Sequence, residues 1–241
     1  MIAFRSGLFN VVFYVNLILF LVIGSPLLLG PRMWAIRALQ LWATSSLWWL
    51  KVLCNIRIEV RGREHIPVGA ALVAGKHHSL WETFAILPLL DDPCMVLKRE
   101  LILIPLFGWF GMKFRMIAVE RSAGSAALRK LVKRGKEEVA RRRQIVIMPE
   151  GTRKGPDDPP DYKPGAAALY GQLGVPCVPF GLNAGLFWPR RKFLRTPGTI
   201  VLEFLPAIPA GLKRGEFQSR LETAIEASTR ALVAEARSKQ N

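Results

Sequence analysis

The stretch AALVAGKHHSLWET, residues 70–83, joins an apolar run to a polar turn and then to the start of a helical pattern. The small and branched apolar residues at 70–75 are typical of a buried strand, and residues 81–90 are typical of a helix. A strand followed directly by a helix is the repeating unit of an α/β sheet. Functional side chains gather at the carboxyl ends of such strands, so His77 lies where we expect a site.

The same alternation of strands and helices continues along the chain. Short apolar runs predict strands at 70–75, 94–98, 115–119, 144–149, 176–181 and 199–204. Apolar residues at helical spacing, with Ser, Pro or Gly near the ends, predict helices at 81–90, 122–143, 164–174 and 214–237. We therefore expect one α/β domain, residues 55–241, with a sheet flanked by helices.

The first 54 residues are a different kind of sequence. No charged residue occurs between Arg5 and Arg32, and a run of roughly 20 apolar residues is long enough to cross the hydrocarbon core of a bilayer. A second apolar stretch, at 38–53, follows glycines and prolines that end or turn a helix. This pattern predicts a two-helix membrane hairpin in residues 1–54. A cleaved signal peptide is the alternative, but the apolar run is longer than such segments usually are.

Charge and hydropathy together also indicate a membrane surface. The chain carries 34 Lys and Arg against 18 Asp and Glu, a net charge of +16, and its mean hydropathy is +0.23. Nucleic-acid-binding proteins are usually basic and polar, whereas a protein that rests on anionic lipid is often both basic and apolar. We therefore expect an anionic membrane surface as a partner, and no nucleic acid.

The distribution of the basic residues gives two further expectations. Positive charges that follow the first apolar helix outnumber Arg5 before it, which predicts that the α/β domain is cytoplasmic. Basic segments at 129–143 and 188–195 are candidates for contact with anionic lipid, the second with aromatic residues interleaved. A solvated helix face is the alternative interpretation of the first segment.

His77 and Glu82 are spaced so that the carboxylate can reach the imidazole across a turn. A carboxylate bound to one imidazole nitrogen fixes the tautomer and leaves the other nitrogen free as a general base. No protein nucleophile is needed if the substrate supplies the hydroxyl. A metal site is disfavoured, because adjacent histidines rarely converge on one ion and no further ligands stand nearby. A packed or solvated turn is the remaining alternative.

Other candidate residues also follow predicted strands. In MPEGTRKG, residues 148–155, Gly151 and Thr152 offer backbone N–H groups and Arg153 offers a planar fork suited to phosphate. Basic residues end two further strands, Lys98 in KREL and Arg121 in VERS. Each of these motifs alone is compatible with an ordinary turn bearing solvated charges. The fifth stretch, VPCVPFGLN at 175–183, is by itself typical of a core strand.

Taken in order, the five motifs resemble the glycerolipid acyltransferase family. The resemblance runs from about residue 55 to 210, and the apolar N-terminal segment fits it too. It implies a single mixed sheet flanked by helices, of the glycerol-3-phosphate acyltransferase type. It also implies acyl transfer from acyl-CoA or acyl-carrier protein to the sn-2 hydroxyl of 1-acyl-sn-glycerol 3-phosphate (lysophosphatidic acid), which gives phosphatidic acid. No cofactor or metal is expected, and the location implied is the cytoplasmic face of the bacterial inner membrane.

The resemblance also implies a role for each motif residue. His77 is the general base, and Glu82 takes the place of the family's Asp. Lys76 replaces the usual Asn, which leaves the role of that position open, and His78 replaces the usual Gln as a bystander. The expected substrate-binding residues are Lys98, Arg121, Glu150, Gly151, Thr152 and Arg153 for the phosphate, and Pro179 for the region near the acyl chain and thioester.

Three alternatives to this function stay open. An acyltransferase for another lysolipid, such as a lyso-ornithine lipid, would share the same motifs. A non-catalytic membrane-binding protein with a degenerate site is favoured only by the change from Asp to Glu82. A hydrolase is disfavoured, because the sequence has no Gly-x-Ser-x-Gly elbow.

Overall fold

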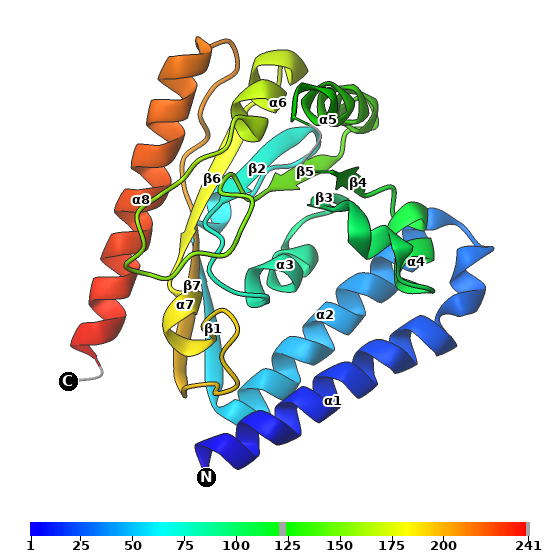
Figure 1. Ribbon diagram of the computed structural model, residues 1–241, viewed down its shortest axis with the longest axis vertical. Coiled ribbons are helices and arrows are strands. Elements are labelled where there is room, and N and C mark those ends of the chain that lie inside the picture. The colour runs from blue at the N-terminus through cyan, green and yellow to red at the C-terminus, as the bar shows by residue number, and fades with distance from the viewer. Residues whose placement is uncertain (121–123, 240–241) are drawn as a thin grey trace.

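The computed structural model describes residues 1–120 and 124–239, which form a seven-stranded sheet in the order β1-β7-β6-β2-β5-β3-β4 (Figure 1). β2 to β6 are mutually parallel, whereas β1 and β7 are parallel to each other and antiparallel to the rest. The predicted mixed α/β sheet is thereby confirmed. The strands are β1 (Ile56–Arg61), β2 (Ala71–Gly75), β3 (Pro93–Lys98), β4 (Ile117–Val119), β5 (Gln144–Ile147), β6 (Cys177–Leu182) and β7 (Gly198–Phe204).

β1 is a strand that the sequence analysis does not predict. Its sequence, IRIEVR, alternates apolar and charged residues, and its burial alternates at the start in the same way. It lies at the edge of the sheet beside β7, where one side of the strand meets solvent. The predicted strands were continuous apolar runs, which are typical of central strands buried on both faces.

Helices cover both faces of the sheet. They are α3 (Trp81–Ala85), α4 (Phe107–Lys113), α5 (Gly124–Val139), α6 (Gly165–Leu173), α7 (Ala184–Phe187) and α8 (Arg214–Ser238). Alternate residues of a strand point to opposite faces, and β2 shows this directly. Leu72 and Ala74 join a hydrophobic cluster with α5, α6 and α8, whereas Val73 joins a second cluster with α3, α4 and the N-terminal helices.

Two predicted helices differ in extent from those observed. The helix expected over 81–90 is split, since α3 ends at Ala85 and a 3₁₀ turn spans Leu87–Leu89. Pro88 has no backbone N–H to continue the α-helix, which accounts for the change. The helix expected over 122–143 is α5, which ends at Val139, and residues 121–123 lie outside the described residues.

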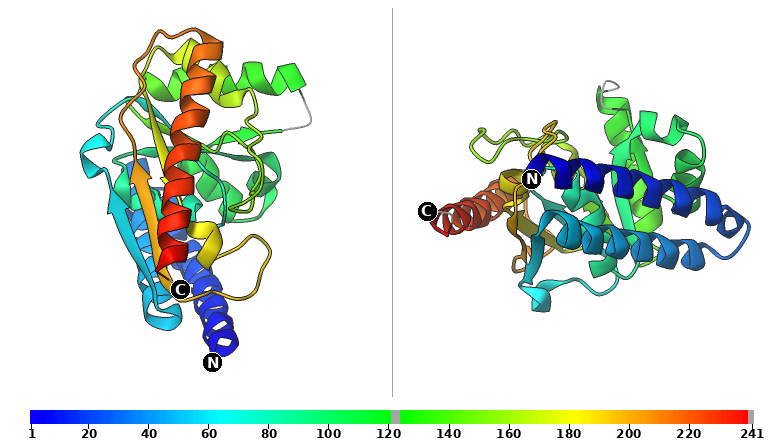
Figure 2. Two further views of the ribbon diagram at one scale, coloured as in Figure 1. Left: turned by 90° about the vertical axis from the view of Figure 1, so that its left-hand side faces the viewer. Right: turned by 90° about the horizontal axis from the view of Figure 1, so that it is seen from below.

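The N-terminal segment is the predicted pair of helices, α1 (Ile2–Ile23) and α2 (Arg32–Cys54), joined by a 3₁₀ turn at Ser25–Leu28. They lie side by side under the α/β domain (Figures 1 and 2). Within the described residues, α1 is the one helix long and apolar enough to cross a membrane, which is weak evidence by itself. Phe9 and Phe13 belong to the same hydrophobic cluster as the sheet, and the division of the chain at residue 54 stays a prediction.

Candidate active site

The candidate site begins where β2 ends. A Cβ at Gly75 would lie 2.3 Å from ring atoms of Phe180 on β6, so only glycine fits at this last position of the strand. From there the chain directs Lys76 into the protein interior, where it is 1% exposed, and leaves His77 partly accessible. The neighbouring side chains of Lys76 and His77 therefore lie in different environments, one in the interior and one partly open to solvent.

His77 and Glu82 meet as the spacing predicts. His77 Nδ1 lies 2.7 Å from Glu82 Oε1, and the backbone N–H of Ser79 donates to the same oxygen at 2.6 Å. Glu82 is fully buried at the start of α3, while the His77 side chain is 12% exposed. With the Nδ1 proton directed at the carboxylate, Nε2 is the nitrogen left for a substrate hydroxyl. A glutamate thus spans the distance in the position where the family has an aspartate.

His78 has the opposite character. It is fully buried, and neither ring nitrogen has a hydrogen-bond partner among the described residues. Burial lowers its pKa to about 4, so the ring is neutral at physiological pH. It forms no hydrogen bond with His77 or Glu82 among the described residues, and its role as a bystander stays a prediction.

Lys76 is the centre of a buried ionic cluster, here called the Lys76 network. Its Nζ lies 2.9 Å from Glu150 Oε1 and 2.7 Å from Glu226 Oε1. Tyr162 donates its hydroxyl to Glu226 Oε1 at 3.0 Å, and the backbone N–H of His77 donates to Glu150 Oε2 at 3.4 Å. Burial raises the pKa of the Glu150 carboxyl, although the hydrogen bond and charge of Lys76 oppose the change.

Glu226 and Tyr162 were missed by the sequence analysis. Tyr162 lies only seven residues beyond the motif at 148–155, but no pattern there singles it out. Glu226 is far from the motifs, in a helix predicted only from its apolar spacing. The sequence does contain a pattern that could have identified Glu226. It lies at helical spacing with Thr229 and Val233 on the buried face of α8. A carboxylate on the buried face of an amphipathic helix needs a cation or donors as partners.

The loop after β5 lies against His77. The backbone N–H of Lys154 donates to the His77 carbonyl at 2.8 Å, which brings the loop that carries Gly151, Thr152 and Arg153 to His77. Gly151 adopts a left-handed φ of 64°, a conformation that favours glycine, and its N–H closes a turn onto Met148. Glu150, expected from the resemblance to contact the phosphate, is 1% exposed and bonded to Lys76 and His77.

Arg153 is a half-buried cation of this loop. Burial lowers its pKa, with the nearby Glu82 carboxylate opposing the change and Arg190 adding to it. Arg190 donates from Nη1 to the Arg153 carbonyl at 2.8 Å. In residues 1–120 and 124–239 no carboxylate forms an ion pair with Arg153, so its guanidinium is available to an anion next to His77.

The remaining predicted site residues lie in different settings. Lys98 ends β3 at the surface, with Nζ 2.7 Å from Glu100 Oε1. Pro179 is buried within β6, opposite Ala74 of β2. Arg121 lies outside the described residues. Their roles in substrate binding stay predictions.

In the part of the chain that the structure describes, no group of three or more His, Cys, Asp or Glu side chains is arranged to hold a metal ion. The chemistry available at the site is that of an oriented imidazole beside an unpaired guanidinium: proton transfer at a hydroxyl that is held by an anionic group.

A family model described as Acyltransferase matches residues 57–183. The chain belongs to the Acyltransferase family. The matched segment of this acyltransferase includes the His77–Glu82 pair and the loop from Glu150 to Arg153, and it confirms the resemblance seen in the motifs. It ends before α8, so Glu226 lies outside it.

Relatives of known name agree with the family. The chain is 37% identical over 171 residues to the 1-acyl-sn-glycerol-3-phosphate acyltransferase of Pseudomonas aeruginosa, covering 71% of this chain and 66% of that protein. It is 27% identical over 177 residues to the human 1-acyl-sn-glycerol-3-phosphate acyltransferase beta, covering 72% and 64%. These alignments thus span slightly less than two thirds of each relative's own length.

A solved structure has the same fold. The 1-acyl-sn-glycerophosphate (LPA) acyltransferase of Thermotoga maritima superimposes with a TM-score of 0.78, over 96% of this chain and 98% of that one, at 21% identity. The agreement covers nearly the whole chain, and so includes the N-terminal pair of helices together with the sheet.

Proposed function

We propose that this acyltransferase transfers a fatty acyl group from an acyl thioester to the sn-2 hydroxyl of 1-acyl-sn-glycerol 3-phosphate, giving phosphatidic acid. The observation that carries the proposal is the His77–Glu82 pair, joined at 2.7 Å, near Arg153, whose guanidinium has no ion-pair partner in the part of the chain that the structure describes. The printed names of the relatives from Pseudomonas aeruginosa and human point to the same reaction. An intact, oriented base argues against a degenerate, non-catalytic site.

In the proposed mechanism, His77 Nε2 accepts the proton of the acceptor hydroxyl as the oxygen attacks the thioester carbonyl. The tetrahedral intermediate collapses with loss of the thiolate, which takes the proton back from the imidazolium. Glu82 holds the ring through Nδ1 and stabilises the imidazolium that forms between these steps. A positioned general base typically contributes about 100- to 10,000-fold to the rate.

Arg153 is proposed to bind the phosphate of the acceptor, together with the backbone of Gly151 and Thr152. The loop is tied to the His77 carbonyl through Lys154, so a phosphate held there keeps the acceptor hydroxyl within reach of the base. Lys98 and Arg121 are proposed as further cations for the same group. Glu150 is proposed to act from behind the site, since its carboxylate faces Lys76 and the His77 backbone.

The membrane is proposed to lie against the outer face of the hairpin. That face continues onto α4 and the 188–195 loop, where Arg195 joins the loop to α1 through Ser6 and Asn10. α1 stays packed on the α/β domain along its length, which fits insertion of its outer face into one leaflet. The exposed apolar residues include Phe4, Leu8, Val11, Val15, Ile18, Leu19 and Val22 on α1, Trp109 and Met112 on α4, and Phe193 and Leu194 in the loop.

The proposed location is the cytoplasmic face of the bacterial inner membrane, with anionic lipid as the surface that the +16 chain contacts. Flotation of the purified chain with anionic and with zwitterionic vesicles tests the preference. Stronger binding to the anionic vesicles is expected, and it should weaken with added salt. Equal binding to both would remove the electrostatic part of this proposal.

The substrate is tested with purified chain in lipid vesicles, supplied with lysophosphatidic acid, lyso-ornithine lipid or monoacylglycerol. Each acceptor is paired with acyl-CoA and with acyl-carrier protein as the donor. Transfer to lysophosphatidic acid from at least one donor, and little transfer to monoacylglycerol, is the expected result, because Arg153 needs an anion. Transfer to lyso-ornithine lipid alone would move the function to the other acceptor.

A further inference from the structure

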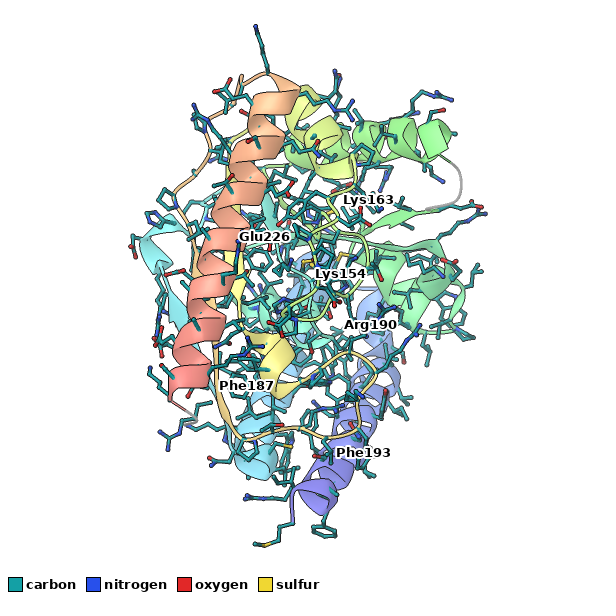
Figure 3. All side chains as sticks on the ribbon, turned by 60° about the vertical axis from the view of Figure 1, so that its left-hand side comes forward. Lys154, Lys163, Phe187, Arg190, Phe193 and Glu226 are labelled. Carbon is teal, nitrogen blue, oxygen red and sulfur yellow. The ribbon has the colours of Figure 1, made fainter. Side chains whose placement is uncertain are left out.

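The C-terminal helix α8 contributes a buried charge to the candidate active site. Glu226 is 6% exposed, and its Oε1 accepts from both Lys76 Nζ at 2.7 Å and the Tyr162 hydroxyl at 3.0 Å. Figure 3 shows Glu226 on the side of α8 that faces the loop carrying Lys154 and Lys163. One carboxylate therefore joins α8, the end of β2 and the loop after β5.

Lys76 is not placed to touch a substrate. Its side chain is 1% exposed, and its ammonium is held between two carboxylates, Glu150 and Glu226. A buried ionic cluster is a poor way to stabilise a fold, because removing the charges from water costs about as much as their attraction returns. Its position next to the base suggests a different use.

The network supports the backbone of His77. Glu150 accepts a hydrogen bond from Lys76 Nζ through Oε1 and from the His77 N–H through Oε2, at 2.9 Å and 3.4 Å. On the other side of His77, its carbonyl accepts from the Lys154 N–H at 2.8 Å. Lys76 binds Glu150 and Glu226 at the same time. The position of the His77 backbone therefore depends on a charge carried by α8.

We propose that Lys76 and Glu226 are positioning residues for acyl transfer, and that α8 completes the active site through their ion pair. The proposal rests on the proposed function and goes beyond it, since Glu226 lies outside the residues that match the family. Replacement of the family's Asn by Lys76 then has a physical reason. A longer, charged side chain reaches a partner on α8 and holds Glu150 in the orientation that supports the base.

The main test compares Glu226→Gln with Glu222→Gln in the full-length chain. Glu226→Gln keeps the shape and an acceptor oxygen but removes the charge. Glu222 is one turn earlier on the same helix, half-buried, and forms no ion pair with Lys76. We expect kcat of Glu226→Gln with lysophosphatidic acid to fall about 10- to 100-fold, since small displacements of a base cost that much. KM should stay within about twofold, and Glu222→Gln should match the wild type.

Lys76→Met and the double variant Lys76→Met with Glu226→Gln extend the test. If the two residues act through one pair, the double variant loses no more kcat than the worse single variant, instead of the product of both losses. Thermal unfolding of each variant measures the folded fraction, so that kcat refers to folded protein. If Lys76→Met fails to fold, the comparison of Glu226→Gln with Glu222→Gln still tests whether Glu226 positions His77.

Three results would overturn the proposal while leaving the proposed function standing. These are an unchanged kcat in Glu226→Gln, a rise in KM at constant kcat, and a loss explained entirely by the unfolded fraction. A wild-type chain that transfers no acyl group to lysophosphatidic acid, from either donor, would overturn the proposed function and this proposal together.

Discussion

The two edges of the sheet both hold buried charges, but they use them differently. At the carboxyl edge the Lys76 network lies behind His77. At the amino edge, Arg143 before β5 binds Asp92 Oδ1 through Nε at 2.9 Å and Glu138 Oε2 through Nη1 at 2.8 Å. Its Nη2 donates to the carbonyls of Pro93 and Phe114, both at 2.9 Å. The Arg143 network, defined by Arg143, Asp92 and Glu138, is thus anchored to the starts of the strands.

The difference between the edges lies in what is left unpaired. The guanidinium of Arg143 is fully buried, and each of its nitrogens donates to a carboxylate or a carbonyl. At the carboxyl edge, Nε2 of His77, Oε2 of Glu82 and the guanidinium of Arg153 form no hydrogen bond or ion pair among the described residues. Satisfied buried charge specifies the fold, whereas free bonding capacity at an accessible edge is what a substrate needs.

The largest expected effect comes from breaking the amino edge. Arg143→Leu leaves Asp92 and Glu138 without their shared cation, and removing one member of a buried pair costs about 3–5 kcal/mol. Chemical unfolding followed by Trp fluorescence measures the loss. The fraction that remains folded should keep the kcat of the wild type.

Arg141→Leu is the matched control, because Arg141 is exposed and donates only to the Glu137 carbonyl among the described residues. We expect a change within about 0.5 kcal/mol for this surface position. A lower kcat in folded Arg143→Leu, with an unchanged free energy of unfolding, would contradict the assignment of stability to the amino edge and of catalysis to the carboxyl edge.

The next effect comes from the carboxyl edge. Glu82→Gln removes the charge that we propose stabilises the imidazolium of His77, and we expect kcat to fall about 10- to 100-fold with little change in unfolding. Glu82→Asp should retain part of the activity, since the shorter side chain reaches His77 or the Ser79 N–H less well. Steady-state transfer to lysophosphatidic acid measures both.

A surface glutamate beside a histidine provides a control for the two Glu82 variants. Glu64 lies 3.8 Å from His65 Nε2 at an exposed turn, so Glu64→Gln removes a carboxylate charge beside a histidine that is not part of the candidate site. It should leave kcat unchanged. If Glu64→Gln and Glu82→Gln lowered kcat equally, the effect would be one of overall charge and not of orientation.

The smallest effect is a dependence of stability on pH. Burial tends to raise the pKa of Asp92, but hydrogen bonds and charge from Arg32 and Arg143 more than offset it. Burial likewise tends to raise the pKa of Glu138, and there Arg143 and Arg115 more than offset it. Both pKa values are lowered from 3.8 and 4.5, so the unfolded chain binds protons first as pH falls. The contribution of these two carboxylates to the free energy of unfolding is fully present above about pH 5 and is lost as pH falls through the lowered pKa values.

Unfolding measured between pH 7 and pH 3 should show this loss in the wild type and a shallower one in Arg143→Leu. Equal slopes in the two chains would mean that Asp92 and Glu138 do not depend on Arg143 for their charge.

The sequence predicts local features of this protein better than distant ones. His77 and Glu82 are five residues apart, so a turn between strand and helix was enough to bring them together. Glu226 is 150 residues from Lys76, and no local pattern links them. The same holds for Arg143, which the sequence places in a basic run suited to lipid or solvent, but which the fold buries against Asp92. Long-range ion pairs depend on topology, which spacing does not encode.

The most direct test of the account is formation of phosphatidic acid by the wild-type chain and by His77→Ala, in the same vesicles and at equal concentrations of folded protein. The account predicts turnover by the wild type and a loss of about 100- to 10,000-fold in His77→Ala, with unchanged unfolding. A His77→Ala chain that forms phosphatidic acid at the wild-type rate would contradict it.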